Sequence, residues 1–317
     1  MGGGNWSNDA YSSLRNSYTN KSVDQIFSSK KLAQNMNPYG VKFREARDSD
    51  DHPNSLAVMI WLDVTGSMGR IPEVLIREKL SGVMSTLVNH NVSDASVFFG
   101  AIGDHLADSA PLQVGQFESD TNKLVDCLTS TFLEGGGGGQ NKESYLLAWL
   151  FAGRHTSIDC FEKRGEKGVL FTIGDEASWT EVSGNKLSVI MGYDLSNRLK
   201  EIIGLSESQA ITDVQVLEEA QRLYHVFHIH VNEGSYRDNP AILGYWRNIL
   251  KERLIVLNDY TKIAEVIATT VAMIHGVDLE TIASSFDSST AMSVKTALMG
   301  INTDARISKR EPGVFKL

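Results

Sequence analysis

Apolar and polar positions along this chain form blocks that predict strands and helices in alternation. The apolar run from Leu56 to Leu62 shows no polar interruption, which is typical of a strand buried on both faces of a parallel sheet. The next segment, Ile71 to Asn89, is predicted as a helix. Further strands are predicted at 97–102, 112–117, 169–173, 226–231 and 254–257, and further helices at 122–131, 142–153, from 212 onward and at 263–274. This order predicts an α/β fold that is doubly wound, with a mostly parallel central sheet and helices on both faces.

The two ends of the chain differ from this alternating part. Residues 1–40 contain six Asn and seven Ser among scattered apolar residues. Such a segment cannot bury enough surface to fold alone, so residues 1–54 are predicted to be an accessory arm that docks on the domain or on a partner. Residues 55–275 form the predicted domain. Residues 276–317, with a Ser-rich stretch at 284–290, form a C-terminal tail.

A polar motif, Asp63-Val64-Thr65-Gly66-Ser67-Met68-Gly69, follows directly on the first predicted strand. Loops at the carboxyl ends of parallel strands point into the crevice where open α/β sheets bind ligands. One carboxylate and two hydroxyls at spacing i, i+2 and i+4 are hard oxygen donors that suit a Mg²⁺ ion. The alternative is a polar turn that caps the next helix. The apolar strand before it and the Gly-Ser-Met-Gly run within it favour the metal site.

A second strand, Val169 to Ile173, ends in Gly174-Asp175-Glu176. Asp175 is predicted to project from the same edge of the sheet as Asp63. A simple strand-terminating Gly-Asp turn is the alternative.

The pattern Asp63-x-Thr65-x-Ser67, with Gly66 and Met68-Gly69, resembles the first loop of the metal-ion-dependent adhesion site (MIDAS) of von Willebrand factor A (VWA) domains. The resemblance implies the doubly wound fold. It also implies that Asp175 holds the metal, usually through water. Thr65 and Ser67 would coordinate the ion directly, and Asp63 would accept from coordinated waters or hydroxyls.

The second loop departs from the family pattern. Gly137 to Ser144 is similar to the form Gly-Gly-Gly-Asp-x-Pro-Glu, but Gln140 replaces Asp and Lys142 replaces Pro. Gln140 still offers a carbonyl oxygen and Glu143 a carboxylate. Which of the two reaches the metal is left open by the sequence.

The resemblance implies a divalent-metal-dependent protein-interaction module with a role in assembly or regulation, in some relatives beside an AAA+ ATPase. The expected cofactor is Mg²⁺, with Mn²⁺ or Ca²⁺ as alternatives. The ion would have fewer than its full complement of protein ligands, which leaves a position that an Asp or Glu of a partner protein can fill. Because most of the donors are neutral, the ion stays electrophilic and favours such a carboxylate.

Charge and composition argue against several other classes of protein. A net charge of −9, from 30 basic and 39 acidic residues, argues against binding to nucleic acid or to an anionic membrane. No apolar run approaches the ~20 residues that cross a bilayer, and the first twenty residues do not resemble a secretory signal. Cys127 and Cys160 are expected to be reduced thiols. These features predict a cytoplasmic protein.

An enzyme is the less favoured interpretation. Asp63-Val64-Thr65 matches half of the Asp-x-Asp signature of haloacid dehalogenase phosphatases, but Thr65 occupies the place of the second Asp, the general acid. The sequence contains neither a Gly-x-Ser-x-Gly elbow nor a Walker motif. A metal-dependent phosphoester hydrolase stays as the alternative. A zinc site at His228 and His230 is weaker, because no third ligand is spaced near them.

Overall fold

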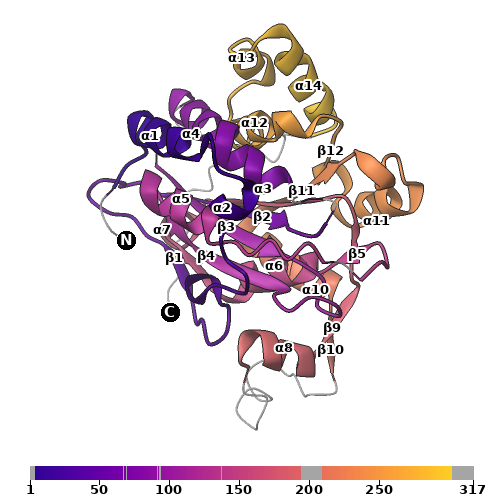
Figure 1. The fold of residues 1–317 in the computed structure, drawn as a ribbon. Coiled ribbons are helices and arrows are strands. Elements are labelled where there is room, and N and C mark those ends of the chain that lie inside the picture. The colour runs from indigo at the N-terminus through magenta and orange to yellow at the C-terminus, as the bar shows by residue number, and fades with distance from the viewer. Residues whose placement is uncertain are drawn as a thin grey trace, which may run out of the picture.

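A six-stranded, mostly parallel sheet lies at the centre of the structure, a computed structural model that describes residues 4–66, 68, 70–90, 92, 94–136, 138–193 and 209–301 (Figure 1). Its strands are β2 (Leu56–Asp63), β3 (Ala95–Ile102), β4 (Leu112–Glu118), β7 (Gly168–Gly174), β11 (Tyr224–Val231) and β12 (Leu254–Leu257). Their order is β12-β11-β7-β2-β3-β4, and only the β3–β4 pair is antiparallel. The predicted strands and the mostly parallel sheet are confirmed.

Later strands of the chain lie on both sides of β2. β3, the next strand of this sheet, pairs with one edge of β2, and β7 pairs with the other edge. Asp63 lies opposite Ile102 of β3, and Leu62 lies opposite Ile173 of β7. The carboxyl ends of β2 and β7 therefore flank the switch point of the sheet, which is the usual ligand position in open α/β folds.

Helices cover both faces of the sheet, because both faces are apolar. Along β2, Val58, Ile60 and Leu62 enter one hydrophobic core, whereas Met59 and Trp61 enter the other. The first face is covered by α1 (Asn8–Tyr18), α3 (Arg70–Val74), α4 (Leu80–Asn89), α5 (Thr121–Thr129) and α12 (Ile263–Ile274). The second is covered by α6 (Tyr145–Arg154), α7 (Asp159–Arg164), α8 (Gly184–Met191), α10 (Asp213–Leu223) and α11 (Pro240–Leu250).

One predicted helix begins later than the sequence indicated. The helix expected from Lys142 starts at Tyr145, and Lys142–Glu143 form the short strand β5, which pairs in parallel with β8 (Ala177–Ser178). Asn141, with a φ of 58°, turns the backbone just before β5. Helical spacing of apolar residues could not reveal this pairing, because the partner strand lies more than thirty residues away.

The helix that follows β2 was predicted over 71–89 and is found, but it is not uniform. Between α3 and α4 the residues Leu75–Lys79 form η2, a π-helical turn.

The capping box predicted at Thr212 and Gln215 is present. Gln215 N donates to Thr212 Oγ1 at 3.3 Å, and Thr212 N donates to Gln215 Oε1 at 2.9 Å.

The N-terminal arm docks on the domain. It contains α1, α2 (Val23–Ile26), η1 (Gln34–Met36) and β1 (Arg44–Ala46), which pairs with β6 (Thr156–Ile158). Four of its apolar side chains, Tyr11, Ile26, Phe27 and Met36, are buried in the core of the first face. The arm thus contributes to the core, which its scattered apolar residues did not predict.

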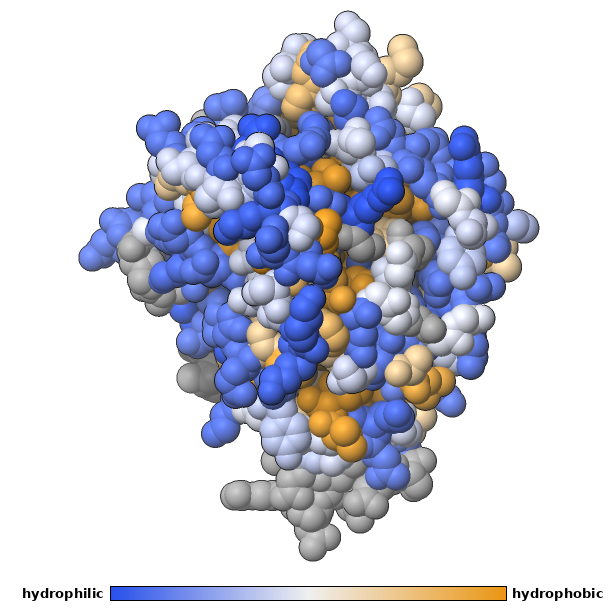
Figure 2. Space-filling view, in the orientation of Figure 1, coloured by the Kyte–Doolittle hydropathy of each residue, from blue (hydrophilic) through white to orange (hydrophobic). Residues whose placement is uncertain are grey.

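After α12 the chain continues into the helices α13 (Leu279–Ala283) and α14 (Ser288–Leu298), which lie next to α12 (Figure 1). Their side chains Ile282, Val294 and Leu298 are buried in the same core. Smaller elements complete the described chain: the antiparallel pair β9 (Glu181–Ser183) and β10 (Ala210–Thr212), and the 3₁₀ turns η3 (Gly234–Tyr236), η4 (Lys251–Arg253) and η5 (Tyr260–Lys262). Hydrophilic side chains cover most of the face in Figure 2. None of the described helices has the length and apolarity that a membrane crossing needs.

Candidate functional site

Asp63, the last residue of β2, is fully buried. Its Oδ1 accepts two hydrogen bonds from Thr65, from the backbone N at 2.9 Å and from Oγ1 at 2.6 Å. This local arrangement is an Asx-type turn, which holds the loop close to the strand end. Because the Thr65 hydroxyl donates its proton to Asp63, its oxygen lone pairs stay available to another electrophile.

The second oxygen of Asp63 is bound by a residue that the sequence did not single out. Tyr145, the first residue of α6, donates from its hydroxyl to Asp63 Oδ2 at 2.7 Å. Gly174, at the end of β7, makes room for this contact, since a Cβ atom there would lie 1.7 Å from the Tyr145 hydroxyl oxygen. Tyr145 lies only two residues after Glu143, and this proximity was the one sequence signal that could have marked it as a site residue.

Asp175 and Glu176 follow β7 directly and are both buried. β7 pairs with β2, so these carboxylates lie at the strand end that neighbours Asp63. Burial raises the pKa of the Asp63 carboxyl to about 7, and the negative charge of Asp175 adds to this rise, against the hydrogen bonds from Thr65 and Tyr145. Burial likewise raises the pKa of Glu176.

Glu143 enters the same region from β5. Its pairing with Ser178 of β8 fixes its backbone beside the segment that carries Glu176. The side chain is only 1% exposed, and its Oε2 has no hydrogen-bond partner among the residues that the structure describes. Burial, followed by the charges of Asp63 and Glu176, raises the pKa of Glu143 to about 11. A carboxyl group in this position requires a proton or a cation.

The two candidates from the glycine loop differ in their surroundings. Gln140 is exposed, whereas Glu143 is buried among the other carboxylates. Gly66 N donates to the carbonyl of Gly136 at 3.2 Å, so the glycine loop contacts the loop that follows β2. Ser67, the remaining predicted ligand, lies outside the described residues.

Asp104 is a further buried carboxylate, and no motif of the sequence analysis includes it. It follows β3, the other neighbour of β2, so the strand-end rule that selected Asp175 could have found it. Its Oδ1 accepts from Trp179 Nε1 at 2.9 Å, while Oδ2 has no hydrogen-bond partner within the described chain. Its charge contributes to the raised pKa of Glu143.

These donors fit a hard cation in chemistry, although not as a cluster of charged ligands. In the part of the chain that the structure describes, no three His, Cys, Asp or Glu side chains are gathered as a metal-holding group. The Thr65 hydroxyl instead donates to Asp63, the charge of Asp175 acts on Asp63, and the charge of Asp63 acts on Glu143. Glu143 Oε2 is buried without a hydrogen-bond partner, and this observation favours a cation at the site. No ion pair within the described residues involves Glu143 or Asp63.

The histidine pair on β11 lies in the core. His228 and His230 are both fully buried, and the His228 ring stacks on Trp246 with 3.5 Å between ring centroids. Thr172 Oγ1 lies 3.0 Å from His228 Nδ1. Burial lowers the pKa of both imidazoles, so they are neutral at physiological pH.

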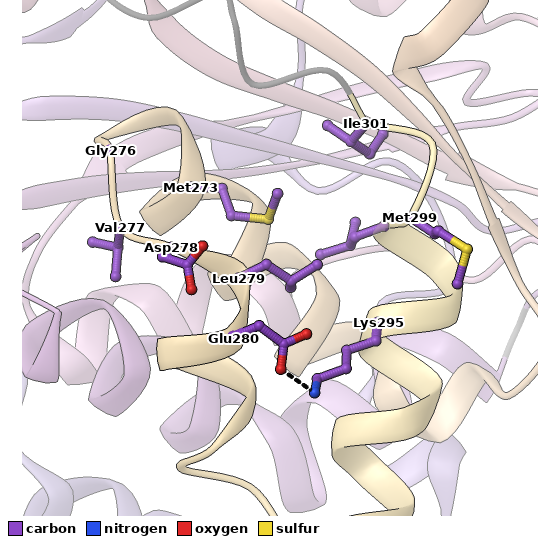
Figure 3. Close-up of a pocket in the computed structure, with 10 residues that line it drawn as sticks. Met273, Gly276, Val277, Asp278, Leu279, Glu280, Lys295, Met299 and Ile301 are labelled. Carbon is purple, nitrogen blue, oxygen red and sulfur yellow. Dashed lines mark hydrogen bonds and ion pairs between the residues drawn. The ribbon is translucent and has the colours of Figure 1, made fainter.

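A cavity of about 430 Å³ lies elsewhere, between α12, α13 and α14 (Figure 3). Met273, Leu279 and Ile301 line it, and an ion pair between Glu280 and Lys295 stands at its side. None of the candidate site residues lines this cavity.

Neither a protein-family model nor a curated protein matches the chain. Among solved structures, the pilus adhesin SpaC from Lactobacillus rhamnosus GG, in its open conformation, is 10% identical over 72% of this chain and 31% of its own, with a TM-score of 0.46. Proximal thread matrix protein 1 from the mussel byssus is 6% identical over 69% of this chain and 48% of its own, with a TM-score of 0.43. The tip pilin GBS104 from Group B Streptococcus agalactiae is 11% identical over 67% of this chain and 97% of its own, with a TM-score of 0.35.

The chain thus spans about a third of the length of the pilus adhesin and about half that of the byssus protein. At these TM-scores the likeness carries no argument about function.

Proposed function

We propose that this chain is a VWA-type, doubly wound domain that binds a divalent cation in a MIDAS-type site and, through it, an acidic residue of a partner protein. The observation that carries the proposal is that Asp63 and Glu143 are both buried near the switch point of the sheet, where the charge of Asp63 raises the pKa of Glu143. Glu143 has no hydrogen bond to its Oε2 among the described residues, and burial raises the pKa of both carboxyls. A bound cation would remove this imbalance.

Thr65 and Glu143 are assigned as protein ligands of the ion, together with Ser67 on the evidence of the sequence. Thr65 is suited because its hydroxyl proton is directed to Asp63, at an Oγ1–Oδ1 distance of 2.6 Å. Of the two glycine-loop candidates, Glu143 is preferred over Gln140, because Glu143 is buried beside the other carboxylates and Gln140 is exposed.

Asp63 and Asp175 are assigned to orient the ligands and the coordinated water, not to bind the ion directly. Asp63 already accepts from Thr65 and from Tyr145, so it orients the ligand hydroxyl rather than offering both oxygens to the ion. When bound, a Mg²⁺ or Mn²⁺ ion would supply an open coordination position for an incoming carboxylate.

A partner carboxylate is the favoured occupant of the open position, because an ion held by several neutral donors keeps much of its positive charge. The protein carries a net charge of −9, so long-range attraction does not bring an acidic partner to it, and the decisive attraction must be local. Cytoplasmic assembly or regulation, beside an AAA+ ATPase in some VWA proteins, is the setting that we propose.

The test compares proteins that co-purify with the tagged full chain in Mg²⁺ and in chelator. We expect at least one partner that is lost with chelator and with Asp63→Ala. Asp51→Ala, which changes an exposed carboxylate, should retain it. Turnover of p-nitrophenyl phosphate that needs both Mg²⁺ and Asp63 would favour a hydrolase instead. A partner set that is the same in all samples would refute the proposal.

A further inference from the structure

The helix that follows the Asp63 loop has an unusual hydrogen bond. The backbone N–H of Leu80 donates to the carbonyl of Leu75, five residues earlier, which is the π-helical pattern. In a regular α-helix the same N–H would donate to Ile76, four residues earlier. Single π-turns inside α-helices are rare and frequently accompany functional sites.

The hydroxyl of Tyr11, from the N-terminal arm, occupies the place of the displaced bond. It donates to the carbonyl oxygen of Ile76 at 2.8 Å and lies 3.4 Å from that of Leu75. The backbone N–H of Leu80 also faces this hydroxyl. Tyr11 is 2% exposed, so water does not substitute for it. A side chain inserted into the i→i−4 ladder is a recognised cause of such local distortion.

Further bonds hold the arm along the same helix. Arg77, within η2, donates to the backbone carbonyl of Tyr18 at 2.6 Å and to that of Lys21. One turn further along, the hydroxyl of Ser81 donates to Asn8 Oδ1 at 2.8 Å. α1 and α4 accordingly lie side by side (Figure 1).

The helix is joined to the candidate site without a spacer. Ile71 N donates to the carbonyl of Met68 at 3.0 Å, and Met68 N donates to that of Thr65 at 3.0 Å. Converting the π-turn to an α-turn would take one residue out of the wider turn, a change of about 100° in rotation and ~1.5 Å in rise along the helix. Such a change would shift Met68 and Thr65, because these backbone hydrogen bonds tie both residues to the start of the helix.

We propose that the N-terminal arm is a latch that regulates the metal site. Tyr11 keeps the helix after β2 in its π form, and the docked arm thereby holds Thr65 in the position where its hydroxyl is directed to Asp63. Release of the arm lets the helix adopt the α-helical pairing and lowers the affinity for the ion. By thermodynamic reciprocity, a bound ion strengthens docking of the arm. The effect on metal binding rests on the proposed function, whereas the latch itself does not.

The test uses the full chain with Tyr11→Phe, which removes only the inserted hydroxyl. Tyr18→Phe is the matched control, because Tyr18 lies on the same helix and contacts Arg77 through its backbone carbonyl. In Tyr11→Phe, without added metal, amide hydrogen exchange in residues 8–18 should be about tenfold faster, as expected for a lost buried hydrogen bond. The dissociation constant for Mn²⁺ should rise at least about fivefold. Tyr18→Phe should resemble wild type in both measurements.

Arm exchange and Mn²⁺ affinity test separate parts of the proposal. Unchanged exchange in Tyr11→Phe would overturn the latch, and faster exchange with unchanged Mn²⁺ affinity would overturn its coupling to the site. If wild type binds no Mn²⁺, the proposed function and the regulation fail together, while arm exchange still decides the latch. Should Tyr11→Phe fold poorly, Arg77→Gln removes a separate anchor of the arm and is expected to give the same pair of changes.

Discussion

The hydroxyl of Tyr145 donates a 2.7 Å hydrogen bond to Oδ2 of Asp63, and this bond joins the first residue of α6 to the last residue of β2. It divides the two carboxylate oxygens of Asp63 between two tasks. Oδ2 is held by Tyr145, while Oδ1 orients the Thr65 hydroxyl. The site is therefore preorganised by a contact between segments that lie 82 residues apart in the sequence.

Gly174→Ala should disturb this contact directly. A Cβ atom at Gly174 would lie 1.7 Å from the Tyr145 hydroxyl oxygen and 2.8 Å from Asp63 Oδ2. Overpacking of a buried site costs about 1–3 kcal/mol in free energy of unfolding, which urea denaturation measures. Gly244→Ala, in the exposed part of α11 with no atom within 4 Å of the new Cβ, should instead stabilise the protein by about 0.5–1 kcal/mol. Equal effects of the two substitutions would contradict this packing argument.

Metal affinity should depend on pH, because the ion and a proton compete for the same carboxyls. Burial raises the pKa of Asp63 to about 7 and that of Glu143 to about 11. Binding must therefore release protons, and the Mn²⁺ affinity should rise as pH increases through about 7. Each proton released corresponds to about a tenfold gain per pH unit below the relevant pKa. Titrations between pH ~5.5 and ~8.5 measure the slope. A flat profile would show that ion binding releases no proton from these carboxyls, which contradicts their place in the metal site.

The arm should contribute measurably to stability. Met36 of η1 is fully buried and its Sδ lies 3.8 Å from Cys127 Sγ in α5. Met36→Ala is expected to cost about 2–4 kcal/mol in free energy of unfolding, through lost burial and the cavity that remains. The control Met292→Ala, at a side chain that is 71% exposed, should change stability by less than about 0.5 kcal/mol. Equal unfolding midpoints for the two variants would mean that the arm is not part of the cooperative unit.

The sequence was sufficient for the central strands and for the placement of Asp63 and Asp175 at neighbouring strand ends. Uninterrupted apolar runs such as Leu56 to Leu62 give a strong strand signal, and the carboxyl ends of parallel strands share one edge. The predicted helix start at Lys142 was wrong, and α6 begins at Tyr145, because Lys142–Glu143 form the strand β5 with a distant partner, β8. Local periodicity carries no information about such a pairing.

The same limit explains the other features that the sequence did not reveal. Tyr145 reaches Asp63, and Tyr11 reaches Ile76, only through the tertiary fold. The π-turn at η2 depends on the contact between Tyr11 and Ile76, and the helix sequence itself contains no signal for it. Asp104 differs from these two, because it follows a predicted strand and the strand-end rule could have selected it.

Calorimetric titration of Mg²⁺ and Mn²⁺ into the full chain, with wild type, Asp63→Ala and Asp51→Ala compared at pH ~8, measures whether Asp63 belongs to a metal site. We expect one saturable site in wild type and in Asp51→Ala, and its loss in Asp63→Ala. At an ion concentration ten times the dissociation constant, the gain in free energy of unfolding should be about 1.4 kcal/mol. Absence of binding at millimolar ion in wild type, or equal binding in Asp63→Ala, would contradict the assignment of a metal site to this edge of the sheet.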